Sequence, residues 1–377
     1  MRWIAGIAGV ALLAIVLWDA FETIVLPRRA SGRIRLTRYF YRATWLPFRA
    51  LARRIAAGSR REGTLSLFGP LSLVFLLVTW AAGLVVAFGL LQYANGSSLR
   101  LAGETPSLAL DLYLSGTSFF TLGLGDADPV GTVSRVLTVI ESGVGFGFLA
   151  VVIGYFPVLY QAFSRRETGI SLLDARAGSP PTAVELLRRH AGPGGKDALE
   201  DLLYDWEQWA AELLETHLSY PILAYYRSQH TNQSWLSALT AVLDTCALVM
   251  IGVEGACARQ ARLTFAMARH AVVDLAQLFP SLPRGADEDR LPPGSFDRLR
   301  ERLAEIGLPL PARQDAEDRL AELRELYEPY VSALSRYLLQ PLPPWEPPAP
   351  RRDNWQVTAW DASEGRSRAD RSLPDHF

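Results

Sequence analysis

The sequence has little lysine and little cysteine. Lys196 is its single lysine, so nearly all positive charge in the 377 residues comes from arginine, a preference typical of a GC-rich bacterial genome. The formal net charge is −1, so no basic excess indicates nucleic acid as a partner. The two cysteines, Cys246 and Cys257, would lie about 16 Å apart on one helix, too far for a disulfide. We therefore expect both to be small buried apolar residues.

Motifs of nucleotide-binding and catalytic sites are also missing. No G-x-G-x-x-G opens a helix after a strand pattern, and the chain has no P-loop, no G-x-S-x-G and no catalytic-cysteine context. No run of alternating apolar residues predicts a β-sheet. We therefore expect no enzyme activity and no cofactor.

A transition-metal site is not predicted either. Three histidines and three acids of the second half could meet in a helical bundle, namely His217, His230, His270, Glu212, Asp244 and Glu254. They show no H-x-x-x-H or E-x-x-H spacing, which would place two ligands on one helix face. We expect the histidines to be ordinary core residues.

Three apolar segments are long enough to cross a bilayer: residues 3–26, 67–91 and 133–160. The mean hydropathy of +0.11 is correspondingly high for a soluble protein. The first segment could be a signal peptide, but no small-residue cleavage site follows it, so we predict a retained helix within residues 1–27. Asp19 and Glu22 near its end are expected to pair with the arginines that follow.

Arginine is concentrated between the first two spans, in residues 28–64, and marks the cytoplasmic side of a membrane. The residues are Arg28, Arg29, Arg33, Arg35, Arg38, Arg42, Arg49, Arg53, Arg54, Arg60 and Arg61. We therefore predict a multi-pass protein of the bacterial inner membrane, with its N-terminus outside and its C-terminus in the cytoplasm. A voltage sensor is not expected, because these arginines lie outside the spans.

The outward-facing segment between the second and third spans is not an ordinary loop. Residues 106–120 are apolar and helical in pattern but too short to span, with Thr105 as a plausible N-cap and Pro106 in the first turn. Residues 121–126 follow directly, with glycine at alternate positions. Non-helical backbone at membrane depth is tolerated only where it lines a cavity or is buried in protein. The pattern predicts a re-entrant pore helix and a filter.

The residue types suit a cation filter. Such a filter replaces the water shell of an ion with rings of backbone carbonyls, and Gly123 and Gly125 readily reach the backbone angles that aim carbonyls at one axis. The Thr121 hydroxyl can add an oxygen at the inner end. The negative end of the pore helix favours a cation there. Asp126 and Asp128 would form acidic rings at the outer mouth.

The segment 65–163 resembles the pore module of tetrameric potassium channels, whose usual filter is T-V-G-Y-G-D. The matching residues are Asp111-Leu112-Tyr113, Ser118 to Asp126, Pro129-Val130, Arg135, Glu141 and Gly145. Gly145 follows Gly125 by twenty residues, the spacing of the family's hinge glycine.

The resemblance implies an all-α membrane protein with outer helix 67–91, pore helix 106–120, filter 121–126 and inner helix 133–160. It implies that Thr121, Leu122, Gly123, Leu124 and Gly125 bind permeant potassium, and that Gly145 is a gating hinge. Glu141, Tyr113 and Ser118 would support the filter, and a proton- or ion-sensing role for Glu141 stays open. One chain carries one pore segment, so a homotetramer in the lipid bilayer is expected.

Three positions depart from the family pattern. Leu122 replaces valine, Leu124 replaces the usual tyrosine, and Phe120 stands where a threonine is usual. Leu124 lacks the hydroxyl that would brace a filter. We therefore expect a potassium-preferring pore with weakened discrimination against sodium.

The second half predicts a helical cytoplasmic domain over residues 180–340, after a linker at 168–181. Thr182 to Glu185 reads as a capping box. Helices are expected at 198–218, 235–278 (one or two), 295–307 and 314–339. The apolar stretch 235–253 is expected to be a core helix because Asp244 lies at its centre, and a fourth span is the alternative. Residues 341–377 predict a disordered tail.

The sequence therefore predicts a potassium or weakly selective cation channel subunit. A non-conducting membrane receptor or scaffold that retains the pore fold is the alternative, and a membrane enzyme built on the cytoplasmic helices is a third. The gating stimulus and any regulatory ligand of the cytoplasmic domain cannot be read from these residues.

Overall fold

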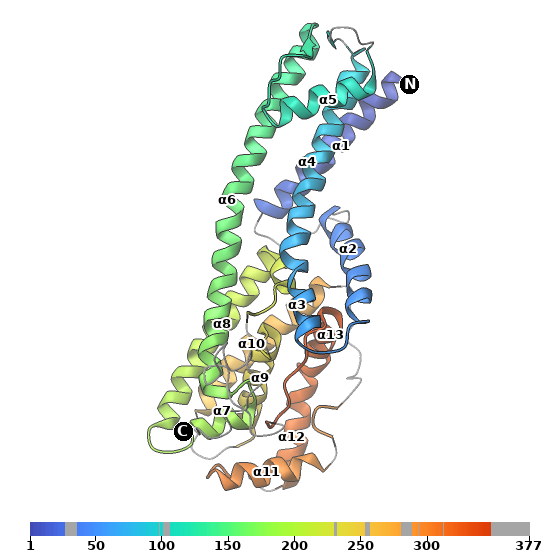
Figure 1. Ribbon diagram of the computed structural model, residues 1–377. Helices are drawn as coiled ribbons and strands as arrows, with labels where there is room; N and C mark the ends of the chain where they lie inside the picture. The colour runs from blue at the N-terminus through green and yellow to red at the C-terminus, as the bar shows by residue number, and fades with distance from the viewer. Residues whose placement is uncertain are drawn as a thin grey trace, which may run out of the picture. The chain divides into compact units, whose positions relative to one another are not determined.

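The protein is described from a computed structural model that covers residues 1–26, 36–97, 99–100, 106–229, 232–252, 257–279, 289–292, 294–311 and 313–347. Apart from one short strand pair, the regular elements of these residues are helices (Figure 1). The chain divides into two compact units, Met1–Gln161 and Ala162–Phe377. Three helical segments are long and apolar enough to cross a membrane, which confirms the all-α membrane fold: Arg2–Ile24, Ser59–Ala94 and Thr132–Ala177.

The first unit is built on the long helix α4. Its elements are α1 (Arg2–Ile24), α2 (Leu36–Ala52), α3 (Ser59–Ser66), α4 (Phe68–Ala94), β1 (Leu99–Arg100), α5 (Leu108–Phe119), β2 (Asp128–Pro129) and the first part of α6 (Thr132–Ala177). Helices α1, α2, α3 and α5 all pack on α4. The strands pair antiparallel, with Leu99 opposite Pro129 and Arg100 opposite Asp128.

Asp19 joins three elements of this unit. Its carboxylate accepts hydrogen bonds from the Trp80 indole N–H (2.9 Å), the Thr37 amide (3.1 Å) and the Thr37 hydroxyl (2.6 Å). The side chain is buried, so these donors replace the water that a carboxylate otherwise requires. Neutral donors of α4 and of the start of α2 thus hold Asp19. The nearest arginines expected to pair with it, Arg28, Arg29, Arg33 and Arg35, lie outside the described residues.

The second unit contains the end of α6 and a helical bundle. Its further elements are α7 (Ala183–Arg189), α8 (Gly195–Ser219), η1 (Pro221–Tyr225), α9 (Trp235–Ile251), α10 (Ala258–Leu278), α11 (Ser295–Glu305), α12 (Arg313–Glu325) and α13 (Glu328–Leu338). Helix α6 continues to Ala177, so most of the linker expected at 168–181 is helix. The helix expected at 314–339 is two helices, with Pro329 in the first turn of the second.

Helix α9 is a core helix of this unit. Nearly all its side chains are buried, and α10, α12, α7 and α13 pack around it. Asp244 at its centre is paired inside the protein with the Arg290 guanidinium and with the Tyr327 hydroxyl, whose oxygen lies 2.5 Å away. A buried acid with these partners suits the core of a helical bundle and would be costly facing lipid.

The chain beyond residue 340 still belongs to the packed bundle. Trp345 is 2% exposed, and its backbone carbonyl accepts a hydrogen bond from Val184 N (3.2 Å). The Pro343 carbonyl accepts from the Arg290 guanidinium at 2.8 and 3.1 Å. The boundary expected at 340 therefore falls within packed structure, and the part of the predicted tail from 348 to 377 lies outside the described residues.

The two cysteines lie on different elements. Helix α9 ends at Ile251 and α10 begins at Ala258, so the single helix assumed for Cys246 and Cys257 is corrected. Both cysteines are free, Cys246 is buried and Cys257 is half-buried.

Candidate functional site

Helix α5, predicted to be re-entrant, begins at Leu108 and ends at Phe119, slightly shorter than the predicted 106–120. Ser107 caps it, accepting a hydrogen bond from Leu110 N at 3.3 Å. The predicted cap, Thr105, lies outside the described residues. At the other end, Thr121 N donates to the Ser118 carbonyl (3.0 Å), and the filter support expected from Ser118 stays a prediction.

The backbone after α5 alternates in conformation. Thr121, Gly123 and Gly125 have φ of +56°, +53° and +75°, so every second residue of this stretch is left-handed. Glycine adopts such angles at little cost, whereas β-branched Thr121 is strained there. The sequence indicated the two glycines but not the left-handed Thr121. Alternation of this kind turns successive carbonyls to one side of the chain, as a carbonyl filter requires.

A buried carboxyl lies behind this stretch. Glu141 of α6 is completely buried, and its Oε1 is hydrogen-bonded to the Ser115 hydroxyl of α5. The same hydroxyl oxygen lies 2.7 Å from the Val85 carbonyl of α4. Among the described residues, Glu141 Oε2 has no hydrogen-bond partner. Sequence reasoning placed Glu141 near the filter but missed Ser115, whose residue type alone gives no signal of this role.

Gly145 provides the close approach between α6 and the end of α5. A Cβ at this position would lie 1.9 Å from the Phe119 carbonyl oxygen and 2.8 Å from its carbon. No real side chain tolerates such distances, so only glycine lets the two helices meet here. Gly145 makes this close contact within an uninterrupted helix, and its expected role as a gating hinge stays a prediction.

Tyr113 and Asp126 connect α5 to the stretch predicted to form the outer mouth. The Tyr113 hydroxyl donates to Asp126 Oδ2 at 2.6 Å, and Ala127 N donates to Asp126 Oδ1 at 3.0 Å. The Tyr113 hydrogen bond lowers the pKa of Asp126, because it favours the ionised carboxyl. Asp128 does not join this pair and lies in β2, at the register position opposite Arg100.

Three further hydrogen bonds that the sequence did not indicate hold the elements around α5 together. Gln92 of α4 accepts a hydrogen bond from the Ser134 hydroxyl (2.7 Å) and donates to Thr138 Oγ1 (3.2 Å), which joins α4 to α6. Buried Asp111 of α5 accepts from the Ser97 hydroxyl at 2.6 Å. Asp111 was part of the resemblance but had no assigned role.

An apolar cavity of about 540 Å³ opens beside Phe120 and Thr121, at the start of the predicted filter. Val78 and Val85 of α4, Phe120 and Thr121 before the filter, and Phe146 of α6 are among its lining residues. It lies entirely within the first unit, and its walls are almost wholly apolar.

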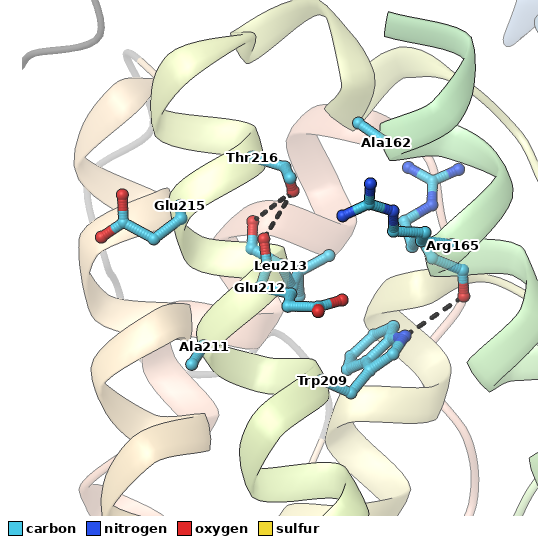
Figure 2. Close-up of a pocket in the computed structure, with 9 residues that line it drawn as sticks. Ala162, Arg165, Trp209, Ala211, Glu212, Leu213, Glu215 and Thr216 are labelled. Carbon is cyan, nitrogen blue, oxygen red and sulfur yellow. Dashed lines mark hydrogen bonds between the residues drawn. The ribbon is translucent and has the colours of Figure 1, made fainter. Parts of the chain in front are cut away.

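A smaller pocket of about 290 Å³ lies in the second unit, between α6 and α8 (Figure 2). Its polar groups are partly used by the helices themselves: the Trp209 indole donates to the Arg166 carbonyl (3.2 Å) and Thr216 donates to the Glu212 carbonyl (2.7 Å). Arg165 extends over this pocket with an exposed side chain.

The histidines of the second unit do not gather at a metal. Among the described residues, no group of three histidine, cysteine or acidic side chains could hold a metal ion. Buried His217 lies 3.3 Å from the Arg166 guanidinium and against the Trp235 ring. Burial, and then the nearby Arg166 charge, lower its pKa well below the usual value, so it stays neutral. His230 and Glu254 lie outside the described residues.

Comparisons with known proteins agree with this geometry. Residues 74–161 match the family model described as "Ion channel", which covers α4 from Val74, α5, the filter and the first part of α6. The chain is also 29% identical over 243 residues to the uncharacterized membrane protein YdjJ of Bacillus subtilis (strain 168), a match that covers 63% of this chain and 67% of that protein. No solved structure matches. Residues 74–161 are thus similar to an ion-channel module, within a chain that has three helices long and apolar enough to cross a membrane.

Proposed function

We propose that four copies of this chain form a potassium-preferring cation channel, with one carbonyl filter at their shared axis. The observation that carries the proposal is the alternation of left-handed backbone at Thr121, Gly123 and Gly125, directly after a helix too short to span. The helix directs its negative C-terminal end toward the start of the filter, where a cation is favoured.

A tetramer is supported by the apolar side chains that a single chain leaves exposed in and before the filter. Leu122 and Leu124 are 60% and 61% exposed, and Phe120 is exposed as well. Apolar side chains in such a filter need neighbouring protein around them, because irregular backbone at membrane depth must not face lipid. One chain contributes only one filter strand, and closed rotational symmetry supplies the others. Neighbouring copies would also cover the apolar cavity next to Thr121.

The orientation proposed is N-terminus outside and the second unit in the cytoplasm. Its support is the arginine-rich stretch between the first two spans, of which Arg38, Arg42, Arg53, Arg54 and Arg60 are exposed in the structure. Arginine-rich loops next to membrane spans lie on the cytoplasmic side. The acidic mouth at Asp126 then faces the external solution.

Selectivity between potassium and sodium is proposed to be weaker than in a tyrosine filter. Leu124 offers no hydroxyl, so the bracing of the mouth depends on Tyr113 and Asp126. Discrimination depends on how firmly the carbonyls are held or on their number and field strength. The variant Leu124→Tyr is the paired comparison: we expect its reversal potential under opposed potassium and sodium gradients to shift toward that of a more selective pore.

The decisive experiment is cation flux through purified protein in liposomes, with potassium and sodium tested in turn. We expect flux that Gly123→Ala or Gly125→Ala abolishes, because alanine disfavours a positive φ. Gly154→Ala is the matched control: this α6 glycine has no atom within 4 Å of an added Cβ, so its flux should stay normal. Absence of flux from the native protein would favour the receptor or scaffold alternative, and normal flux from the filter variants would remove the filter assignment.

A further inference from the structure

Helix α2 carries a strip of arginines that lies outside the matched ion-channel module. At 100° per residue, Arg38, Arg42, Arg49 and Arg53 fall within an arc of about 60°. Arg53 follows the last residue of α2, and its amide donates to the Arg49 carbonyl at 3.0 Å, so the helical turn continues to it. We call these four residues the arginine strip.

Most of the charge on this strip is not neutralised by the described residues. No acidic residue occurs between Glu22 and Glu62. Arg38, Arg42 and Arg53 are exposed, and none of the three forms an ion pair with an acid in the described part of the chain. Arg54 and Arg60 nearby are exposed as well. Exposed cations at this density call for an anionic partner.

A second strip runs beside the first. Tyr39, Ala43, Leu46 and Ala50 follow helical spacing, all four are exposed, and Tyr39 is 57% exposed. An exposed apolar strip next to an arginine strip is the pattern of a helix that lies at a membrane interface, where apolar side chains enter the headgroup boundary. Tyrosine is enriched at that level. A soluble polyanion would have no use for this apolar strip.

The remaining face of α2 is fixed to the membrane-spanning helices. Phe40 packs on Phe75 with ring centroids 5.2 Å apart, and buried Trp45 packs on Phe68 at 4.8 Å. Thr37 at the start of α2 is hydrogen-bonded to Asp19 of α1. Helix α2 is therefore attached to the C-terminal end of α1 and to the first part of α4 (Figure 1).

From these observations we infer that α2 is a lipid-binding element that recognises anionic phospholipid headgroups of the inner leaflet. The arginine strip contacts the phosphates, and the apolar strip enters the acyl boundary. The lipid is thus a ligand of this chain and stabilises the attachment of α2 to α1 and α4. This inference does not depend on whether the pore conducts.

The test is binding of fluorescent phosphatidylglycerol to the full-length protein in neutral detergent, compared with fluorescent phosphatidylcholine. We expect tighter binding of phosphatidylglycerol, weakening as salt is raised. The double variant Arg38→Gln with Arg42→Gln should bind it on the order of 25-fold more weakly, about fivefold for each arginine near the membrane surface. Leu46→Asn should weaken the binding of both lipids.

The matched control is Arg259→Gln with Arg262→Gln, two exposed arginines of α10 in the second unit. It removes the same charge and should leave phosphatidylglycerol binding unchanged. Equal affinity for the two lipids, or an equal loss in the control, would overturn the proposal. Competition by an oligonucleotide as effective as that by phosphatidylglycerol would also overturn it, since the surface would then bind any polyanion.

Discussion

The hydroxyl of Ser115 lies between two acceptors, the Glu141 carboxyl and the Val85 carbonyl. A hydroxyl has one proton to donate, so it cannot satisfy both acceptors as a donor. A neutral Glu141 carboxyl satisfies both hydrogen bonds. It donates its proton to the Ser115 hydroxyl, and this hydroxyl donates its own proton to the Val85 carbonyl. Through this chain of two hydrogen bonds, helices α4, α5 and α6 meet behind the filter.

Glu141→Gln should therefore preserve the structure. The glutamine amide can donate to Ser115 as a neutral carboxyl does, so we expect the stability of the protein to change by less than about 1 kcal/mol. Glu141→Leu leaves Ser115 without that partner and should cost about 1–3 kcal/mol. Thermal unfolding in detergent compares the two variants. An infrared difference spectrum between wild type and Glu141→Gln should show a carboxylic-acid carbonyl band, and a carboxylate band in its place would contradict the neutral form.

Gly145→Ala should disturb the end of the pore helix. The added methyl would collide with the Phe119 carbonyl, so α6 and α5 must separate, at a cost of about 1–3 kcal/mol or more. We expect lower thermal stability and reduced flux. Gly143→Ala, two residues away with nothing within 4 Å of its Cβ, is the control and should behave as wild type. If both variants behave alike, close packing at Gly145 is not important.

Tyr113→Phe should change the pH dependence of the pore. In the native protein the Tyr113 hydroxyl holds the pKa of Asp126 below its usual value, so the carboxylate stays charged as the solution is acidified. Without that hydrogen bond the pKa returns toward the usual value. The stabilisation from this bond is present at neutral pH and is lost as pH falls through the native pKa. Flux of the variant should therefore begin to fall at a higher external pH than that of wild type, and coincident profiles would show that Asp126 does not concentrate cations.

Truncation should separate the packed end of the second unit from the C-terminal residues beyond it. Ending the chain after Pro347 keeps Trp345 and should leave thermal stability unchanged, because the composition of residues 348–377 is poor in residues that form a core. Ending it after Gln340 removes Trp345 and the carbonyl of Pro343. We expect a loss of about 3–5 kcal/mol, most of which Trp345→Ala should reproduce. Equal stability of the two truncated chains would show that residues 341–347 contribute nothing.

The sequence predicted those features that depend on the local pattern of residues, namely the apolar spans, the glycine positions and a helix cap. Three long apolar runs predicted the spans, and alternate glycines at 123 and 125 predicted a left-handed backbone there. Thr182 also caps α7 as expected, accepting from Glu185 N at 3.3 Å. The Glu185 carboxylate, however, binds Arg188 and Arg189 and does not close the capping box.

Contacts between distant residues were not readable. Trp80, 61 positions from Asp19, donates to its carboxylate, a contact that no local pattern in the sequence indicates. Ser115 and Gln92 gave no signal, since serine and glutamine occur in many environments, and Asp111 matched the family pattern without indicating its partner Ser97. The end of the bundle was placed at 340 because proline-rich segments resemble tails, although Trp345 is buried.

The hydrogen bond between Asp19 and Trp80 has a consequence for biosynthesis. Its two residues are 61 positions apart, so α1 leaves the ribosome well before α4. An aspartate near the middle of an isolated membrane helix costs about 2.5–3.5 kcal/mol during insertion, and Asp19 lies nearer the end, where the cost is lower. During that interval α1 holds an acid without its indole donor. The two Thr37 donors are made before α4, so Trp80 adds the last of the three donors to Asp19, and pairing with α4 is expected to stabilise α1 further in the membrane.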